Sequence, residues 1–327
     1  MTSRAGLTAG QGVPLDPDVV RFRDREQGQG FPSYVSVGPQ RAREVSRAVT
    51  RWRGSLANVT DEIRSVEDVQ VPGASALRAR VYRPVGRAVG QVLYFHGGGF
   101  VVGDLDTCDA HCRALAARVG AVVTSVDYSL APESPYPIAV DEGLQALRWV
   151  CDEDGPGGAL RSPLAVVGDS AGANLATSVL AQARPDPVIG VQAQLLLYPM
   201  LDPSMSMPSV QENGEGFGLD RTALEWFWRM YLPAGSAATY DVGSPLAVPL
   251  EGMPSSIVVT AGYDPLRDEG EAYARRLQAA GVPTTTLRYP SLVHGFFGWG
   301  AHVPAAQSAI SQICAALRQT LLAGSMT

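Results

Sequence analysis

Short apolar runs alternate along most of the chain with longer segments in which apolar residues recur every three or four positions. The apolar runs predict strands at residues 64–71, 77–83, 91–95, 121–127, 164–168, 192–198, 256–261 and 284–289. The amphipathic segments predict helices at residues 17–27, 39–54, 107–119, 139–151, 171–183, 268–280 and 303–322. Strands that are apolar on both faces are typical of a parallel sheet covered by helices on both sides. We therefore expect an α/β protein with a mostly parallel, eight-stranded sheet.

Two segments interrupt this alternation. Residues 1–60 precede the first strand, and residues 201–243 separate the sixth strand from the seventh. We expect residues 61–200 and 244–327 to form the core, with the two other segments added to it. The second addition is rich in aromatic side chains, which pack against a core or line a pocket.

The chain is acidic, and all of its basic residues are arginine. Its 327 residues include 26 basic and 32 acidic side chains, for a net charge of -6. The absence of lysine excludes Schiff-base and pyridoxal-phosphate chemistry through lysine, as well as a lysine-dependent P-loop. The densest arginine cluster, at residues 41–53, is expected to be the solvated face of a helix. Nucleic acid is therefore not an expected partner.

The four cysteines do not indicate a disulfide scaffold, because a chain of this length can bury a core without one. Cys108, His111 and Cys112 lie close enough in sequence to suggest metal ligands, but no second ligand pair follows at a suitable spacing. We therefore predict neither a metal site nor a cofactor.

No apolar run approaches the length of about 18 residues that a membrane-spanning helix needs. Residues 1–12 also lack the charged and then apolar pattern of a signal peptide. We expect a cytoplasmic protein with no membrane partner. The sequence leaves the oligomeric state open, and a homodimer is one option.

The sequence GDSAG at residues 168–172 follows a predicted strand and opens a predicted helix. A serine with glycines two positions before and after it, at such a junction, is typical of a nucleophile elbow. The turn is so tight that only small residues fit around it, and the hydroxyl of Ser170 is forced out above the sheet. This pattern indicates a serine hydrolase.

Further motifs stand at the ends of other predicted strands. The sequence HGGGF after the third strand is typical of an oxyanion loop, in which Gly98 and Gly99 can offer backbone N–H groups. Ala171, the residue after the nucleophile, would supply a third donor. Asp264 and His294 follow the last two predicted strands, so the chain order is Ser, Asp, His, as in an α/β-hydrolase.

Ser170, His294 and Asp264 together suit nucleophilic catalysis. A serine hydroxyl is too weakly acidic to attack a carbonyl at pH 7 unless a base such as His294 accepts its proton. Asp264 would hold the imidazole in one tautomer and stabilise its protonated form. Asp268 is the competing acid, but it lies in the first turn of a predicted helix, where an acidic side chain mostly offsets the helix dipole.

These motifs resemble those of the hormone-sensitive-lipase-like bacterial carboxylesterases, a family with the α/β-hydrolase fold. The residues that carry the resemblance are 96–100, 127–133, 168–174, 264–269 and 294–296. Two positions depart from the usual pattern of the family, because Ser129 stands where an arginine is common and Ala173 where a second glycine is common. Both are supporting positions, so the departures concern loop packing and substrate fit rather than the triad.

The resemblance implies that residues 1–60 and 201–243 meet over the active site as a helical cap. Four aromatic residues are candidates for contact with the substrate: Phe100, Trp226, Phe227 and Tyr231. On a helix, positions 227 and 231 share a face from which position 226 diverges, so only a subset of them can line one pocket.

The function expected from these residues is hydrolysis of small to medium acyl esters through an acyl-serine intermediate. The same triad could serve acyl transfer or amide cleavage in a biosynthetic pathway. A non-catalytic member of the fold that only binds a ligand is the alternative from a different class.

Overall fold

The computed structural model describes residues 12–56, 61–73, 77–158, 163–184, 186, 189–233 and 244–324. Parts of the two predicted cap segments, residues 1–11, 57–60 and 234–243, lie outside the described residues.

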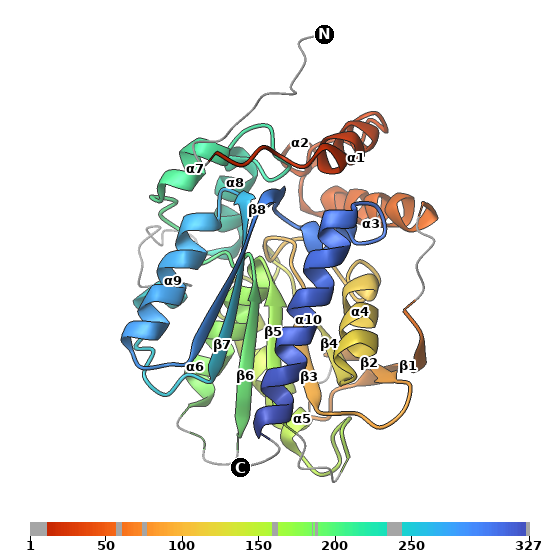
Figure 1. The fold of residues 1–327 in the computed structure, drawn as a ribbon, viewed down its shortest axis with the longest axis vertical. Coiled ribbons are helices and arrows are strands. Elements are labelled where there is room, and N and C mark those ends of the chain that lie inside the picture. The colour runs from red at the N-terminus through yellow and green to blue at the C-terminus, as the bar shows by residue number, and fades with distance from the viewer. Residues whose placement is uncertain are drawn as a thin grey trace.

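Within the described residues, eight strands form one sheet in the order β1-β2-β4-β3-β5-β6-β7-β8 (Figure 1). The strands are β1 (Ile63–Gln70), β2 (Arg78–Pro84), β3 (Gln91–Phe95), β4 (Val122–Asp127), β5 (Leu164–Asp169), β6 (Val191–Leu197), β7 (Ser255–Tyr263) and β8 (Thr284–Val293). β2 pairs antiparallel with β1 and β4, and every other pairing in the sheet is parallel. The predicted α/β fold with a mostly parallel sheet is confirmed.

Strand β8 is longer than the sequence predicts. The predicted strand ends at Tyr289, just before Pro290, a residue that cannot donate a ladder hydrogen bond. In the structure β8 continues through Pro290 to Val293. It lies at the edge of the sheet, where proline is tolerated. The extension carries the chain directly to His294.

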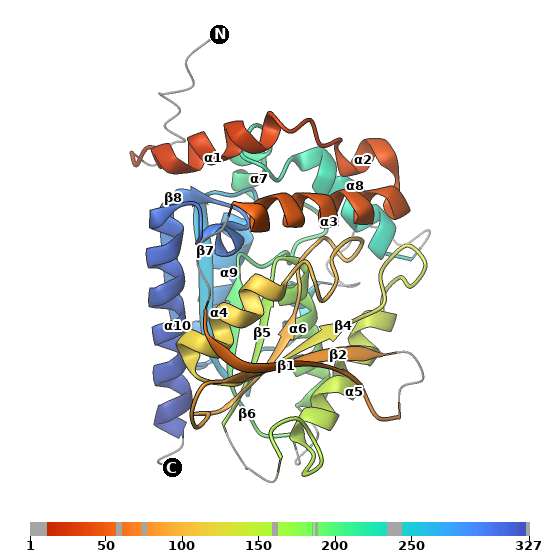
Figure 2. The same cartoon turned by 90° about the vertical axis from the view of Figure 1, so that its right-hand side faces the viewer.

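Helices cover both faces of the sheet (Figures 1 and 2). One face is covered by α4 (Asp109–Val119) and α10 (Pro304–Gly324), and the other by α5 (Ile138–Cys151), α6 (Ala171–Ala183) and α9 (Arg267–Ala279). Each face buries its own apolar cluster, which explains why β3 and β5 are buried along their whole length. Helix α10 runs the length of the sheet and ends near the point where the parallel strands begin, at the bottom of Figure 2.

Five further helices lie above the carboxyl ends of the parallel strands (Figure 2). They are α1 (Pro17–Gln27), α2 (Tyr34–Val37), α3 (Pro39–Ser55), α7 (Pro208–Asn213) and α8 (Arg221–Tyr231), and we call them the cap. Its two pieces touch where the rings of Tyr34 and Phe227 pack at 6.4 Å between centroids. Two short 3-10 helices complete the described structure, η1 (Pro245–Ala247) and η2 (Phe296–Trp299). The division of the chain into core and cap segments at residues 60, 200 and 244 stays a prediction.

The arginines of α3 only partly follow the expected solvated face. Arg41, Arg47 and Arg51 are exposed, but Arg43 and Arg53 are half-buried. They point toward neighbouring elements, where each finds a carboxylate partner. Across the described ranges, none of the helices combines the length and apolar character that a membrane span requires.

Candidate active site

Ser170 occupies a sharp turn between β5 and α6. Its backbone has a φ of 54°, a left-handed conformation that costs a non-glycine residue free energy and persists only where the surroundings impose it. A Cβ at Gly168 would lie 2.2 Å from the carbonyl oxygen of Gly172, and one at Gly172 would lie 2.0 Å from that of Phe95. Both positions therefore require glycine, as the nucleophile-elbow pattern predicts.

The ends of β5, β7 and β8 bring three polar side chains together. The Nε2 atom of His294 lies 3.1 Å from the Oγ atom of Ser170, and its Nδ1 atom lies 2.9 Å from the Oδ2 atom of Asp264. Asp264 is fully buried, and its other oxygen accepts a hydrogen bond of 2.8 Å from the Leu266 N–H. The carboxylate thus has a fixed orientation toward the imidazole. The arrangement can transfer a proton from the serine hydroxyl to the histidine.

Asp268, the competing acid, lies elsewhere. One of its oxygens accepts a hydrogen bond of 2.7 Å from Arg267, and the other accepts one of 2.9 Å from the backbone N–H of Ser209. Asp268 therefore joins α9 to the cap helix α7 rather than orienting His294.

The loop after β7 carries Asp264, and we call it the acid loop. Helix α7 also holds this loop, through neutral, fully buried side chains. The Oγ atom of Ser209 donates a hydrogen bond of 2.7 Å to the Pro265 carbonyl. The Nδ2 atom of Asn213 donates to the carbonyl of Asp264 at 3.2 Å and to that of Gly262 at 3.4 Å. These residues were not singled out from the sequence, because nothing in their own segment shows which distant loop they meet.

The glycine loop after β3 carries two of the residues predicted to form an oxyanion site. Gly98 and Gly99 have φ values of 112° and 59°, which favour glycine. Ala171 is the first residue of α6, so its N–H has no partner within the helix. In the part of the chain that the structure describes, no backbone acceptor is bound by the N–H of Gly98, Gly99 or Ala171. These three N–H groups are the donors that the sequence predicts for an oxyanion.

Asp169 supports the glycine loop from below. Its Oδ1 atom accepts hydrogen bonds from the Tyr94 hydroxyl and, at 2.7 Å, from the Gly97 N–H. The Tyr128 hydroxyl donates a hydrogen bond of 2.7 Å to the His96 carbonyl, and the two rings stack at 4.3 Å. Burial raises the pKa of Tyr128 well above its usual range, so its hydroxyl keeps the proton that it donates.

A cavity of about 650 Å³ lies between the cap and the Ser170 region. Phe227 of α8 is part of its wall and covers Gly99 so closely that a Cβ there would lie 2.1 Å from the ring. Tyr34, Ser46 and Arg53 line it from the N-terminal side of the cap, and none of them was predicted from the sequence. Helical periodicity alone shows that their helices are amphipathic, but not which face meets the cavity.

Three of the four aromatic residues predicted to contact the substrate, Phe100, Trp226 and Tyr231, are not among the residues that line the cavity. The rings of Phe100 and Tyr231 stack face to face at 3.6 Å, and both side chains are buried. Trp226 is buried as well and packs against Phe227 at 5.2 Å. These aromatics fill the space between α8 and the core, so of the four candidates Phe227 is the one that borders the cavity.

Cys108, His111 and Cys112 lie together at the start of α4. Burial lowers the pKa of His111, which favours its neutral form. Within the described ranges, no group of three or more His, Cys, Asp or Glu side chains is arranged to hold a metal ion. His111 borders the cavity, a position that the sequence did not reveal.

A family model described as the alpha/beta hydrolase fold matches residues 92–298, a segment that contains all three polar side chains described above. The chain belongs to the α/β-hydrolase fold family. The family match, together with relatives that are named as esterases, confirms the resemblance to the hormone-sensitive-lipase-like carboxylesterases.

Three relatives of this α/β-hydrolase extend over nearly the whole chain. It is 38% identical to the esterase LipI of Mycobacterium tuberculosis, over 96% of this chain and 98% of that protein. It is 33% identical to the ethyl acetate hydrolase of Pseudomonas putida, over 94% of this chain and 100% of that protein. The solved structure of a hyperthermophilic esterase from Pyrobaculum calidifontis matches with a TM-score of 0.86 and 36% identity, covering 95% of this chain and 100% of the other.

Proposed function

We propose that Ser170, His294 and Asp264 are the catalytic triad with which this carboxylic ester hydrolase cleaves small to medium acyl esters. The observation that carries the proposal is the continuous hydrogen-bonded chain from the Ser170 hydroxyl through both nitrogens of His294 to a fully buried carboxylate. Its relatives, named as esterases and an ethyl acetate hydrolase, support the same chemistry.

In the proposed reaction, Ser170 Oγ attacks the ester carbonyl carbon while His294 Nε2 accepts the hydroxyl proton. The tetrahedral intermediate collapses when the protonated histidine returns that proton to the leaving alcohol, and an acyl-serine remains. A water molecule then gives its proton to His294 and attacks the acyl carbon. Collapse of the second intermediate releases the acid and restores the serine.

In this reaction we place the charge that develops on the carbonyl oxygen beside the N–H groups of Gly98, Gly99 and Ala171. Preorganised backbone donors stabilise this oxyanion without the cost of reorienting water. Ala171 adds the positive end of the α6 dipole. We therefore assign the three residues to the oxyanion hole.

The size of the cavity supports a small or medium substrate. Its volume of about 650 Å³ falls within the range of roughly 300–1,000 Å³ found for small-molecule sites. Phe227 lies over Gly99, so a group bound at the oxyanion site would contact its ring. We therefore assign substrate contact to Phe227.

The test is a series of p-nitrophenyl esters with acyl chains of increasing length, assayed with the wild-type protein and with Ser170→Ala. We expect hydrolysis of the short and medium esters, an initial burst of one p-nitrophenol per active site, and the loss of both in the variant. Metal-independent activity is expected, so a chelator should leave the rate unchanged. Full activity of a folded Ser170→Ala protein would contradict the proposal.

The comparisons do not favour the alternatives of acyl transfer, amide cleavage or ligand binding without catalysis. Adding a small alcohol or amine to the assay distinguishes the first of these, because a transferase would divert most of the acyl-enzyme to the added acceptor.

A further inference from the structure

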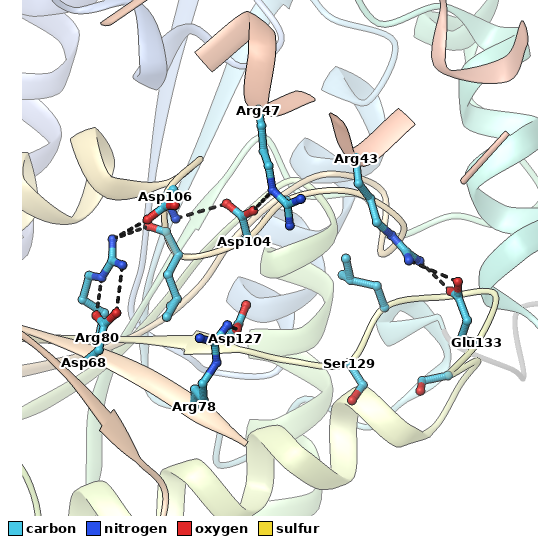
Figure 3. A pocket seen from close by; sticks show the side chains of 14 residues that line it. Arg43, Arg47, Asp68, Arg78, Arg80, Asp104, Asp106, Asp127, Ser129 and Glu133 are labelled. Carbon is cyan, nitrogen blue, oxygen red and sulfur yellow. Dashed lines mark hydrogen bonds and ion pairs between the residues drawn. The ribbon is translucent and has the colours of Figure 1, made fainter. Parts of the chain in front are cut away.

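The glycine loop is connected to the cap by one arginine. Figure 3 shows a pocket beside α3 in which Arg43 and Arg47 descend from the same helix toward different loops. Arg47 meets Asp104, whereas Arg43 reaches toward Glu133. The side chain of Arg43 is only 20% exposed, against 50% for Arg47. The two arginines therefore differ in burial and in the loop that each contacts.

The guanidinium of Arg43 binds three acceptors from two loops. Its Nε atom donates a hydrogen bond of 2.9 Å to the Val101 carbonyl, and its Nη2 atom donates one of 3.0 Å to the Ala131 carbonyl. Its Nη1 atom donates one of 3.1 Å to the Glu133 carboxylate, which Nη2 also contacts. The planar fork of arginine allows this combination, and no other side chain carries enough donors in a fixed plane.

Val101 belongs to the turn that shapes the proposed oxyanion site. The N–H groups of Val101 and Val102 both donate to the Gly98 carbonyl, at 3.1 Å and 3.0 Å. The Ala131 N–H donates a hydrogen bond of 2.9 Å to the Phe100 carbonyl. Arg43 thus binds the carbonyls of Val101 and Ala131, one on each of the two loops that this hydrogen bond joins. Val101 lies two positions after Gly99, whose N–H group is assigned to the oxyanion.

The backbone of this turn needs external support. Gly98, Gly99 and Phe100 have three consecutive φ values in the left-handed region, and for Phe100, at 64°, that conformation is unfavourable. Such a conformation persists only where several contacts determine it. Below the loop, Asp169 holds Gly97, and above it, Arg43 holds Val101.

We propose that Arg43 is a positioning residue, which fixes the oxyanion turn from the cap so that the Gly98 and Gly99 N–H groups point at the developing oxyanion. This inference rests on the proposed function. Arg43 does not contact the reacting atoms. Its removal should therefore weaken binding of the transition state while leaving binding of the ester nearly unchanged.

The experiment compares Arg43→Gln with Arg47→Gln, which removes an ion pair from the same helix but leaves the turn untouched. We measure kcat and KM for p-nitrophenyl butyrate and the inhibition constant of butylboronic acid, which forms a tetrahedral adduct with the serine. Arg43→Gln should lower kcat about 10- to 100-fold, less than the roughly 10²–10³-fold loss of a whole oxyanion donor. KM should stay within about threefold, and boronate affinity should fall in parallel with kcat/KM. Arg47→Gln should change neither by more than about twofold.

The proposal is overturned if Arg43→Gln and Arg47→Gln have the same kcat, or if kcat falls while boronate affinity stays constant. If Arg43→Gln does not fold, Arg43→Lys decides, because it keeps the charge but cannot span both carbonyls. Arg43→Lys should lose kcat and boronate affinity together, and wild-type values for both would overturn the proposal. A wild-type protein that boronate does not inhibit would instead contradict the proposed function.

Discussion

The two pieces of the cap hold two different loops of the proposed active site by different chemistry. On the N-terminal side, α3 holds the oxyanion turn through a charged guanidinium whose partner Glu133 has a side chain 48% exposed. In the insertion, α7 holds the acid loop through Ser209 and Asn213, which are neutral and fully buried.

The difference predicts how the contacts of α3 and of α7 with their loops respond to salt and to mutation. A buried neutral hydrogen bond does not respond to salt, and its loss lowers the free energy of unfolding because no water is at hand to replace it. A half-exposed ion pair is screened by salt and contributes little by itself, so the value of Arg43 lies in its two carbonyl contacts. Loss of the α7 contacts should therefore lower mainly the stability of the protein, and loss of the Arg43 contacts mainly the reaction rate.

The largest effect should come from the acid loop itself. Asp264→Asn removes the charge that orients and stabilises His294, so we expect kcat to fall by about 10³–10⁴ with the fold retained. Asp268→Asn is the matched control and should lower kcat less than about tenfold, because Asp268 contacts Arg267 and Ser209 instead. Steady-state kinetics and circular dichroism measure both. The reverse ranking would move the catalytic role to Asp268.

The second effect separates structural from substrate-contacting aromatics in α8. Tyr231→Ala removes a fully buried ring and should cost about 3–5 kcal/mol of unfolding free energy without changing the order of preferred esters. Phe227→Ala should shift the preferred acyl length, because Phe227 borders the cavity. Denaturant unfolding and the p-nitrophenyl ester series distinguish the two. An unchanged ester preference in Phe227→Ala would show that this ring is structural.

The third effect tests the buried link of α7. Asn213→Ala removes one hydrogen bond from each of two carbonyls of the acid loop, those of Gly262 and Asp264, which both keep a second donor in Arg267. At roughly 0.5–1.5 kcal/mol for each lost hydrogen bond, we expect a loss of about 1–2 kcal/mol in unfolding free energy. Gln211→Ala, an exposed change on the same helix, should stay within about 0.5 kcal/mol. Urea unfolding gives both values. Equal stability of the two variants would mean that α7 does not hold the loop.

The smallest effect concerns the pH dependence of stability that arises from the ion pair between Arg43 and Glu133. Hydrogen bonds from Arg43 lower the pKa of the Glu133 carboxyl below its ordinary value of 4.5. Because the native pKa is the lower one, the contribution of Glu133 is present above about pH 4.5 and is lost as the pH falls through the native value. Melting curves of wild type and Glu133→Gln should therefore differ slightly at pH 7 and converge in acid. A difference that persists at low pH would exclude ionisation as its cause.

The motifs of the site were readable from the sequence because their constraints are local. The glycines around Ser170 and the positions of Asp264 and His294 at strand ends each follow from a few adjacent residues. The contacts of the cap were not readable, since Arg43 meets a carbonyl 58 positions away and Asn213 one 51 positions away. An arginine run and a short polar helix have the same patterns whether they face water or a catalytic loop. The stacking of Phe100 on Tyr231 was not readable for the same reason, because an aromatic pattern does not show which partner a ring stacks against.

Helix α10 offers a practical consequence for the use of this hydrolase as a catalyst. It ends at Gly324, at the end of the sheet farthest from the cap, so its last described turn lies on the opposite side of the molecule from the cap helices (Figures 1 and 2). An attachment tag placed after this helix would anchor the protein to a solid support with the cap, and the cavity beneath it, on the side away from the support. Esters would then reach Ser170 without passing the support.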